Sequence, residues 1–381
     1  MLRILIAPDK FKGSLNSFEV CDAIEKGLRR VPGGDVFQIQ RLPLSDGGDG
    51  LLDILRYYTD AGLRYAGVSD PLSRTISSSW LLSADGRTAF IEMALASGLQ
   101  LLQPSEYNCM LGSTYGTGQL IGEAIRSGAE EIVIGIGGSA TNDGGMGMAA
   151  ALGVRFLDDA GIVLSPSGSN LIKLAKIDVP ETASWPGIRF RVASDVQNPL
   201  CGPQGASIVY APQKGASPEM VGQLEAGMLN YAAVLKRELG IDLADRPGAG
   251  AAGGLGAGCM AFLQAGLVSG VELVIEYSGA LQQVQANDLI ITGEGRIDGQ
   301  TLQGKAVAGI AALGRQYQKP VLAFCGDLAV TAEELQQLGV QAAFSIVDRP
   351  MSLEEAMRDG GKLLESAACH AGSLLLLTLS G

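Results

Sequence analysis

Five loops of this chain contain charged, amide and glycine residues whose types and spacing could bind a ligand or take part in a reaction. They are residues 8–15 (PDKFKGSL), 45–50 (SDGGDG), 135–145 (GIGGSATNDGG), 194–200 (SDVQNPL) and 292–305 (TGEGRIDGQTLQGK). Carboxylates bind Mg²⁺ or accept a hydroxyl proton, lysines neutralise phosphate, and glycines bring backbone N–H groups close to an anion. This combination suits phosphoryl transfer, which needs positioning and charge neutralisation more than a covalent group.

The glycine-rich loop at residues 135–145 follows an apolar run at 132–134 and precedes small apolar residues at 146–152. This order predicts a buried strand, a tight turn and a helix whose N-terminus can hold an anion. A plain turn before a capped helix is the structural alternative, because such loops have many false matches. Asp143 in this loop is an acceptor when ionised, so a cation is a natural partner for it. The glycine–alanine stretch at residues 247–258 indicates either a flexible linker or a second loop close to a ligand.

Asp46 and Asp49 lie three residues apart among three glycines, after a predicted strand at residues 36–42. The two carboxylates could share a Mg²⁺ ion, or one could accept a proton from a substrate hydroxyl. The alternative is an Asx turn that caps the following helix. We expect Asp49 to be that cap and Asp46 to be the more functional of the two.

Lys10 and Lys12 occupy the loop after the first predicted strand, at residues 2–7. Open α/β sheets bind ligands at the carboxyl ends of their strands. Two lysines in a loop are normally solvated on the surface. At the end of a buried strand, however, we give equal weight to a contact between these lysines and a phosphate or carboxylate group.

Two later loops repeat this placement of polar side chains at a strand end. Asp195 and Asn198 follow a predicted strand at 189–193, and a strand at 288–291 precedes Glu294, Arg296, Asp298 and Lys305. Residues 299–305 also match the P-loop spacing G-x-x-x-x-G-K. We interpret that match as false, because Ala306 replaces the Mg²⁺-binding Ser or Thr and the run begins well beyond the strand end.

The composition excludes several classes of protein. The chain has 381 residues, of which 47% are hydrophobic, and a net charge of -12, which predicts a globular protein without a nucleic-acid surface. Its single histidine, His370, argues against a histidine triad or a histidine-bound metal. Its six cysteines show no C-x-x-C spacing, which fits free thiols in a reducing compartment. No apolar run reaches the ~18 residues of a membrane span, so we expect a cytoplasmic protein with no membrane partner.

Apolar strands alternate with helices at the N-terminus and again from residue 288 onward. This pattern predicts one doubly wound parallel sheet that the middle of the chain interrupts. Short strands and turns between residues 63 and 92 predict a meander that leads into a second domain. We place the first domain at residues 1–62 plus 281–381 and the inserted domain at residues 63–280.

Together, and in this order, the five loops resemble those of the bacterial type I glycerate kinase family, over essentially the whole chain. The resemblance implies ATP- and Mg²⁺-dependent phosphorylation of D-glycerate to 2-phosphoglycerate in organic-acid catabolism. It also implies two α/β domains, one flavodoxin-like and one with a restriction-endonuclease-like mixed sheet, with the active site in the cleft between them. We expect a monomer or homodimer that acts on small molecules.

The resemblance and the chemistry of phosphoryl transfer suggest roles for individual residues. We assign Asp195 as general base or Mg²⁺ ligand, Lys10 to the transferring phosphoryl group, and Arg296, with Lys12 as second choice, to the glycerate carboxylate. The candidates are Asp195, Lys10 and Asp46 for catalysis; Arg296, Lys12, Asp298 and Asn198 for substrate binding; Gly137, Gly138, Ser139, Thr141, Gly253 and Gly254 for ATP phosphates; and Asp46, Asp49, Asp195 and Glu294 for the metal.

Other functions stay open at this point. A kinase for another small hydroxy acid, such as tartronate or erythronate, would use the same loops, as would a glycerate 3-kinase. A regulator that binds a nucleotide or sugar acid without turnover is a different class. The full set of carboxylates, Lys10 and the lack of a DNA-binding motif argue against such a regulator.

Overall fold

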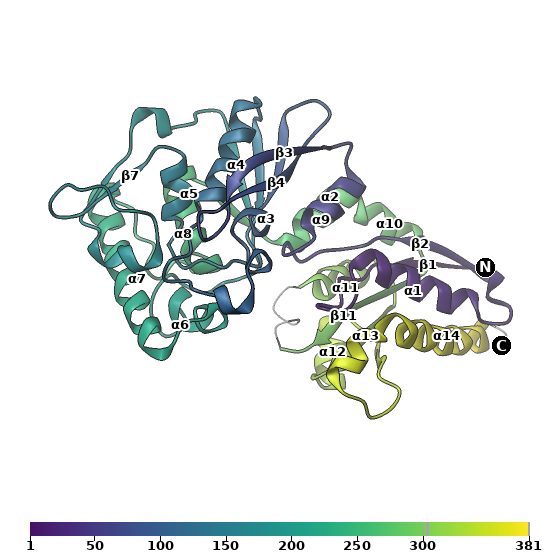
Figure 1. Cartoon of the computed structure of the whole chain (residues 1–381). Helices are drawn as coiled ribbons and strands as arrows, with labels where there is room; N and C mark the ends of the chain where they lie inside the picture. The colour runs from purple at the N-terminus through teal and green to yellow at the C-terminus, as the bar shows by residue number, and fades with distance from the viewer. Residues whose placement is uncertain (300, 302–304, 380–381) are drawn as a thin grey trace. The chain divides into compact units, whose positions relative to one another are not determined.

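The computed structural model describes residues 1–299, 301 and 305–379, and the chain divides into two compact units (Figure 1). The first unit contains Met1–Asp46 and Val271–Gly381, and the second contains Gly47–Gly270. The borders that we placed after residues 62 and 280 therefore lie 16 and 10 residues downstream of these divisions (62 − 46 and 280 − 270). Helix α2 (Leu51–Tyr58) belongs to the second unit, where Leu51 packs closely on Gly135.

The first unit contains a five-stranded sheet in the order β13-β12-β11-β1-β2, in which every pair is parallel. The strands are β1 (Leu2–Ile6), β2 (Phe37–Arg41), β11 (Leu289–Ile297), β12 (Val321–Leu328) and β13 (Ala342–Ser345). Counted within the unit, the order is 2-1-3-4-5, which is that of flavodoxin-like sheets. The predicted doubly wound parallel sheet is confirmed. Its order reverses between β1 and β11, which pair from Ile4 opposite Leu289.

Helices surround this sheet and come from both ends of the chain. They are α1 (Ser17–Arg29), α9 (Gly270–Ser278), α10 (Ala280–Ala286), α11 (Ala306–Gln316), α12 (Ala332–Leu338), α13 (Leu353–Arg358) and α14 (Gly360–Leu379). Asn16 caps α1 in a capping box with Glu19. Figure 1 shows α14 lying beside α1. The absence of a side chain at Gly27 allows this approach, since a Cβ there would lie 2.3 Å from the carbonyl oxygen of Glu365.

The second unit contains a six-stranded mixed sheet in the order β10-β9-β6-β5-β4-β3. Its strands are β3 (Gly62–Ser69), β4 (Thr75–Leu82), β5 (Thr88–Glu92), β6 (Glu131–Gly135), β9 (Arg189–Ala193) and β10 (Gly266–Val268). Strands β3, β4 and β5 are antiparallel, which confirms the predicted meander, and the remaining pairs are parallel. A separate antiparallel pair joins β7 (Arg155–Leu157) to β8 (Lys176–Asp178).

The second unit also contains helices, which lie before and between its strands along the chain. They are α2, α3 (Ala94–Ser97), α4 (Tyr115–Arg126), α5 (Met146–Ala151), α6 (Ala206–Tyr210), α7 (Pro218–Leu239) and α8 (Ala251–Leu263). Short 3₁₀ helices across the chain are η1 (Gly34–Val36), η2 (Leu99–Leu101), η3 (Pro104–Glu106), η4 (Gly168–Lys173), η5 (Glu181–Ala183) and η6 (Pro212–Lys214).

Each unit has a hydrophobic core of its own. Ile4, Ile24 and Phe324 are among the fully buried side chains of the first unit. Leu120 and Ile134 are fully buried in the core of the second unit. All six cysteines are free thiols, as expected from their spacing. Among the described residues, no helix combines the length and the apolar character needed to cross a membrane.

Candidate active site

A pocket of about 790 Å³ lies in the first unit, at the carboxyl ends of β1, β11 and β12. Its position matches the switch point between β1 and β11, where flavodoxin-like sheets bind ligands. The charged side chains that line it are Asp9, Lys10, Lys12, Asp46, Glu294, Arg296, Asp298, Lys305 and Asp327. The structure therefore brings together six predicted site residues from three separate loops: Lys10, Lys12, Asp46, Glu294, Arg296 and Asp298.

Lys10 lies between two carboxylates in this pocket. Its Nζ donates a hydrogen bond to Oδ1 of Asp46 at 2.9 Å and lies 3.9 Å from Oδ1 of Asp9. The backbone N–H of Lys10 also donates to Asp9 Oδ1, at 2.7 Å. Burial, followed by the nearby negative charge of Asp46, raises the pKa of Asp9 to about 7. Lys10 thus carries positive charge into a region that is rich in carboxylates.

Glu294 is the buried carboxylate of the opposite loop. Its Oε1 accepts a hydrogen bond of 2.5 Å from the hydroxyl of Thr301. Burial is the main cause of a raised pKa at Glu294; Thr301 and Lys305 oppose this shift. Thr301 is therefore a partner of the site that sequence reasoning missed, because it lies in the stretch that resembled a P-loop. Residues 300 and 302–304 of that stretch lie outside the described residues.

Arg296 stands at the more exposed part of the same pocket. Its Nε is 3.2 Å from Oδ2 of Asp327 and 3.5 Å from Oδ2 of Asp298. Asp9 and Asp327 were not among the predicted site residues. Both lie at the carboxyl ends of strands, where open α/β sheets bind ligands. The same reasoning that selected the other loops would therefore have selected Asp9 and Asp327.

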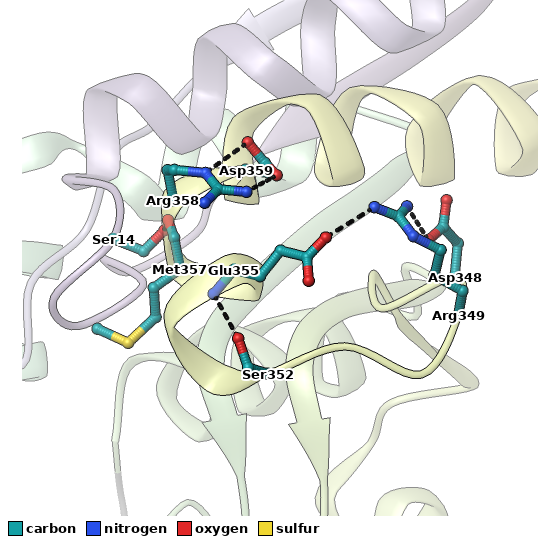
Figure 2. Close-up of polar contacts among 8 residues, drawn as sticks. All are labelled: Ser14, Asp348, Arg349, Ser352, Glu355, Met357, Arg358 and Asp359. Carbon is teal, nitrogen blue, oxygen red and sulfur yellow. Dashed lines mark hydrogen bonds and ion pairs between the residues drawn. The ribbon is translucent and has the colours of Figure 1, made fainter.

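Part of the pocket wall is apolar. It is formed by Phe11, Ile346, Val347, Met351, Leu353, Ala356 and Met357. Short polar contacts hold the segment around α13 in place, as Figure 2 shows. The hydroxyl of Ser14 donates to the carbonyl of Met357 at 2.5 Å, the N–H of Glu355 donates to Ser352, and Arg349 pairs with Glu355 at 3.1 Å. Sequence reasoning missed this wall, because apolar residues on a short helix carry no signal of a ligand.

The predicted glycine-rich loop lies in the second unit and is held by a buried lysine. Nζ of Lys214 donates to the Ser139 hydroxyl and to the Thr141 carbonyl, both at 2.6 Å. Lys214, Ser139 and Thr141 are all buried, and burial lowers the pKa of Lys214 to about 8. Gly137 and Gly138 are more exposed. The contact of these four loop residues with ATP phosphates stays a prediction.

The buried carboxylate of Asp143 has several hydrogen-bond partners within the protein. Its carboxylate accepts hydrogen bonds from the N–H and hydroxyl of Thr114, both at 2.8 Å. It also accepts from the N–H groups of Gly145 and Gly147, both at 3.1 Å, at the start of α5. These four donors give the buried carboxylate partners within the protein, and the cation that the sequence suggested for Asp143 stays a prediction.

Gly253 and Gly254 pack against the glycine-rich loop itself. Both have positive φ, and a Cβ on Gly253 would lie 2.0 Å from the carbonyl oxygen of Thr141. A Cβ on Gly254 would lie 2.8 Å from Cα of Gly144. This close approach of two backbones accounts for both glycines without a ligand. Their predicted contact with ATP is likewise untested.

Asp49 does not cap α2, which corrects our expectation. The N-cap position is Gly50, and the carboxylate of Glu92 accepts from the N–H groups of Gly50 at 3.1 Å and Leu52 at 3.2 Å. Glu92 comes from the end of β5, so the cap is a tertiary contact. Asp49 Oδ1 is buried without a hydrogen-bond partner, and a Cβ on Gly138 would lie 2.2 Å from it.

Asp195 and Asn198 lie after β9, in the second unit. Oδ1 of Asp195 accepts a hydrogen bond of 3.1 Å from the N–H of Gly270. The amide of Asn198 donates to the carbonyl of Gln204 at 2.8 Å, and its oxygen accepts from the Tyr210 hydroxyl at 2.7 Å. Asn198 thus fixes its own loop, and its predicted substrate contact is untested.

The donor chemistry fits Mg²⁺ without a dedicated cage. Within the described part of the chain, no group of three or more His, Cys, Asp or Glu residues is arranged to hold a metal ion. Mg²⁺ commonly takes one or two carboxylates and completes its octahedron with water and phosphate oxygens. Asp46 and Glu294 offer such carboxylates in the pocket, and Asp49 offers a buried oxygen that lacks a hydrogen-bond partner.

A parallel α/β sheet with lysines and carboxylates in a pocket at its switch point suits an enzyme that transfers a phosphoryl group. Residues 4–376 match the model of the glycerate kinase family. The chain is 45% identical to the glycerate kinase of Halalkalibacterium halodurans over 97% of each protein. It is 44% identical to the glycerate 2-kinase of Escherichia coli, over 94% of this chain and 93% of that protein.

A crystal structure assigned to glycerate kinase 2 from Salmonella typhimurium LT2 is similar to the whole chain, with a TM-score of 0.84. That protein is 39% identical in sequence, and the match covers 100% of both chains. The chain belongs to the glycerate kinase family and is a kinase. The family suggested by the five loops is therefore confirmed.

Proposed function

We propose that this enzyme transfers the γ-phosphoryl group of ATP to O2 of D-glycerate and releases 2-phosphoglycerate and ADP. The observation that carries the proposal is the switch-point pocket, in which Lys10 and Lys305 lie with the carboxylates of Asp46 and Glu294. The name of the E. coli relative, glycerate 2-kinase, supports position 2 as the acceptor.

In this reaction the O2–phosphorus bond forms, the bond from phosphorus to the β,γ-bridging oxygen breaks, and a carboxylate accepts the hydroxyl proton. We keep Asp195 as the candidate base and Asp46 as the alternative. Lys10, oriented by Asp46, stabilises negative charge on the transferred group. Mg²⁺, when bound by Asp46 and Glu294, supplies further positive charge to phosphate oxygens. Arg296 or Lys12 would hold the glycerate carboxylate.

The size of the pocket and its mixed charged and apolar lining favour the nucleotide as its main occupant. Glycerate is a small, wholly polar acid, whereas a pocket of about 790 Å³ is typical of drug-sized ligands. We therefore propose that adenine lies against the apolar wall around Ala356 and Met357, with the phosphates toward Lys10 and Lys305.

A substitution in the apolar wall tests the position of the nucleotide. Ala356→Phe places a larger side chain in the apolar wall and narrows the pocket without changing its charge. We therefore expect the KM for ATP to rise at least tenfold while the KM for glycerate stays close to wild type. A fully folded variant with an unchanged KM for ATP would move the nucleotide elsewhere. Gly137 and Gly138 would then be the leading candidates.

The product identifies the reaction. We would incubate the enzyme with ATP, Mg²⁺ and D-glycerate, and follow ³¹P NMR for 2-phosphoglycerate. A 3-phosphoglycerate signal would refute the position of transfer, and phosphorylation of tartronate or erythronate in preference to glycerate would refute the acceptor. A reaction that proceeds equally well after EDTA treatment would refute the need for Mg²⁺.

We also infer a cytoplasmic enzyme of organic-acid catabolism that works as a monomer or homodimer. The free thiols support a reducing compartment. Cell fractionation tests the location, and light scattering of the purified protein tests the oligomeric state.

A further inference from the structure

The glycine-rich loop of the second unit contacts a buried cation that the proposed reaction does not use. Lys214 is the last residue of η6 and is only 2% exposed. Its Nζ donates to the hydroxyl oxygen of Ser139 and to the carbonyl of Thr141, both at 2.6 Å. The next residue, Gly215, packs so closely that a Cβ there would lie 2.4 Å from the carbonyl oxygen of Tyr107. This packing fixes the backbone from which the lysine reaches the loop.

The ammonium group of Lys214 has neutral partners. Both of its acceptors are uncharged oxygens, and within the described part of the chain it forms no ion pair with a carboxylate. Burial lowers the pKa of Lys214 to about 8, and the charges of Cys109 and Asp143 oppose this shift only in part. Lys214 is therefore mostly charged at pH 7. A buried charge is normally paired, so an unpaired cation at this position favours the binding of an anion close by.

The contact with Lys214 determines what the Ser139 hydroxyl can do. An ammonium group only donates hydrogen bonds, so the Ser139 oxygen is the acceptor and its own O–H points away from Lys214. Ser139 is 6% exposed, and its O–H has no acceptor among the residues that the structure describes. The hydroxyl of Thr141 is fully buried and also lacks a partner. Because buried hydroxyls normally have partners, the loop offers two of them to an oxygen of a ligand.

The backbone of the loop supplies further donors beside a negative charge. The N–H groups of Gly137 and Gly138 have no hydrogen-bond acceptor among the described residues, and both glycines are more exposed than Ser139. A Cβ on Gly138 would lie 2.2 Å from Oδ1 of Asp49, so a carboxylate borders the same glycine. Asp49 would repel an anion bound there. Such an anion therefore needs a positive charge close by, and Lys214 supplies it.

We propose that Lys214 is a positioning residue for an anionic group of a substrate. It fixes the Ser139 oxygen so that the Ser139 O–H and the N–H of Gly138 donate to that anion, and its buried charge strengthens both hydrogen bonds. The anion is a phosphate of the nucleotide or the carboxylate of the acid, since both present the same kind of oxygen acceptor. This role rests on the proposed function, because ATP and glycerate are the substrates of the proposed reaction.

The binding of the two anionic groups can be measured separately. We would titrate the wild type and Lys214→Met with ADP plus Mg²⁺ and, in a second experiment, with D-glycerate, by isothermal titration calorimetry. The dissociation constant of one ligand should rise at least tenfold in the variant, while that of the other stays within twofold of wild type. A rise for ADP assigns the loop to a phosphate, and a rise for glycerate assigns it to the carboxylate. A folded variant that loses affinity for neither ligand, or for both equally, would overturn the proposal.

A second substitution tests whether Lys214 acts through Ser139. Ser139→Ala removes the donating hydroxyl and leaves the lysine in place, so it should weaken binding of the same ligand even if Lys214→Met does not fold. In the double variant the two losses should not multiply, because both substitutions remove one shared interaction. Losses that multiply, or an unchanged affinity in Ser139→Ala, would refute the proposed role.

A matched control separates this role from a general effect of charge. Lys173→Met removes one positive charge at an exposed lysine of the same unit, so it should bind both ligands as the wild type does. Calorimetry requires no turnover. The role of Lys214 can therefore fail or hold whichever phosphoglycerate the ³¹P NMR assay detects.

Discussion

Lys10 contacts a carboxylate of the candidate active site directly, through its 2.9 Å bond to Asp46. If it stabilises the transferring group, Lys10→Met should lower kcat by about 10²- to 10³-fold with little effect on folding. Steady-state kinetics and thermal unfolding would measure both effects. Lys26→Met, an exposed lysine on α1, is the matched control and should behave as wild type. Near-normal kcat in Lys10→Met would remove this residue from the mechanism.

Asp195 can be tested by removing its charge while keeping its shape. An asparagine at this position can still accept the hydrogen bond from the N–H of Gly270, so Asp195→Asn should fold normally. Loss of a general base typically costs about 10²- to 10⁴-fold in rate, and we expect kcat to fall within that range. The exposed Asp159→Asn serves as control. An active Asp195→Asn enzyme would show that another group accepts the proton.

The buried amine of Lys214 should make the free energy of unfolding depend on pH. Its pKa is lowered from 10.5 to about 8 by burial. Below about pH 8 both the folded and the unfolded chain carry the charged ammonium, so the full cost of burying it opposes folding. Between about pH 8 and 10.5 the folded protein loses this proton first, and the cost shrinks as the pH rises.

The matched measurement uses urea unfolding of the wild type and Lys214→Met at about pH 7 and about pH 10. The free energy of unfolding of the wild type should rise relative to that of the variant between these two pH values. Groups that titrate in both proteins cancel in this comparison. A difference that does not change with pH would mean that the buried amine is not the group responsible.

At the scale of the element, the start of α2 depends on a side chain from β5. Glu92 accepts hydrogen bonds from two N–H groups at the helix N-terminus and is almost fully buried. We expect Glu92→Ala to lower the free energy of unfolding by about 1–2 kcal/mol, the usual cost of a lost cap. Glu130→Ala, at an exposed glutamate of the same unit, should change it by about 0.5 kcal/mol or less. Equal effects in urea unfolding would argue against the cap.

The same element shows where prediction from sequence fails. Residues 45–50 fix a turn after β2, and the helix from Leu51 follows as expected. The choice of cap, however, depended on Glu92, which local sequence cannot place beside the helix. Because Asp49 does not cap the helix, its buried oxygen is left available to a ligand, and the metal contact that the sequence suggested for Asp49 stays a prediction.

At the scale of the whole molecule, two separate cores predict two regions of local stability. Leu28 is fully buried in the first core and Leu120 in the second. Leu28→Ala should cost about 2–5 kcal/mol and speed amide hydrogen exchange mainly in the first unit. Leu120→Ala should do the same mainly in the second unit. Equal acceleration of exchange throughout the chain in both variants would show a single cooperative unit.

The sequence by itself determined the strands, the loops at their carboxyl ends and, through those loops, the family. These features are local, because a buried apolar run and a glycine-rich turn need only neighbouring residues to be recognised. Tertiary structure alone decided which loops share a pocket. Asp46 and Glu294 line one pocket because β1, β2 and β11 pair side by side, and part of the apolar wall comes from a helix near the end of the chain. Such contacts depend on the order and register of strands far apart in sequence, which no local pattern specifies.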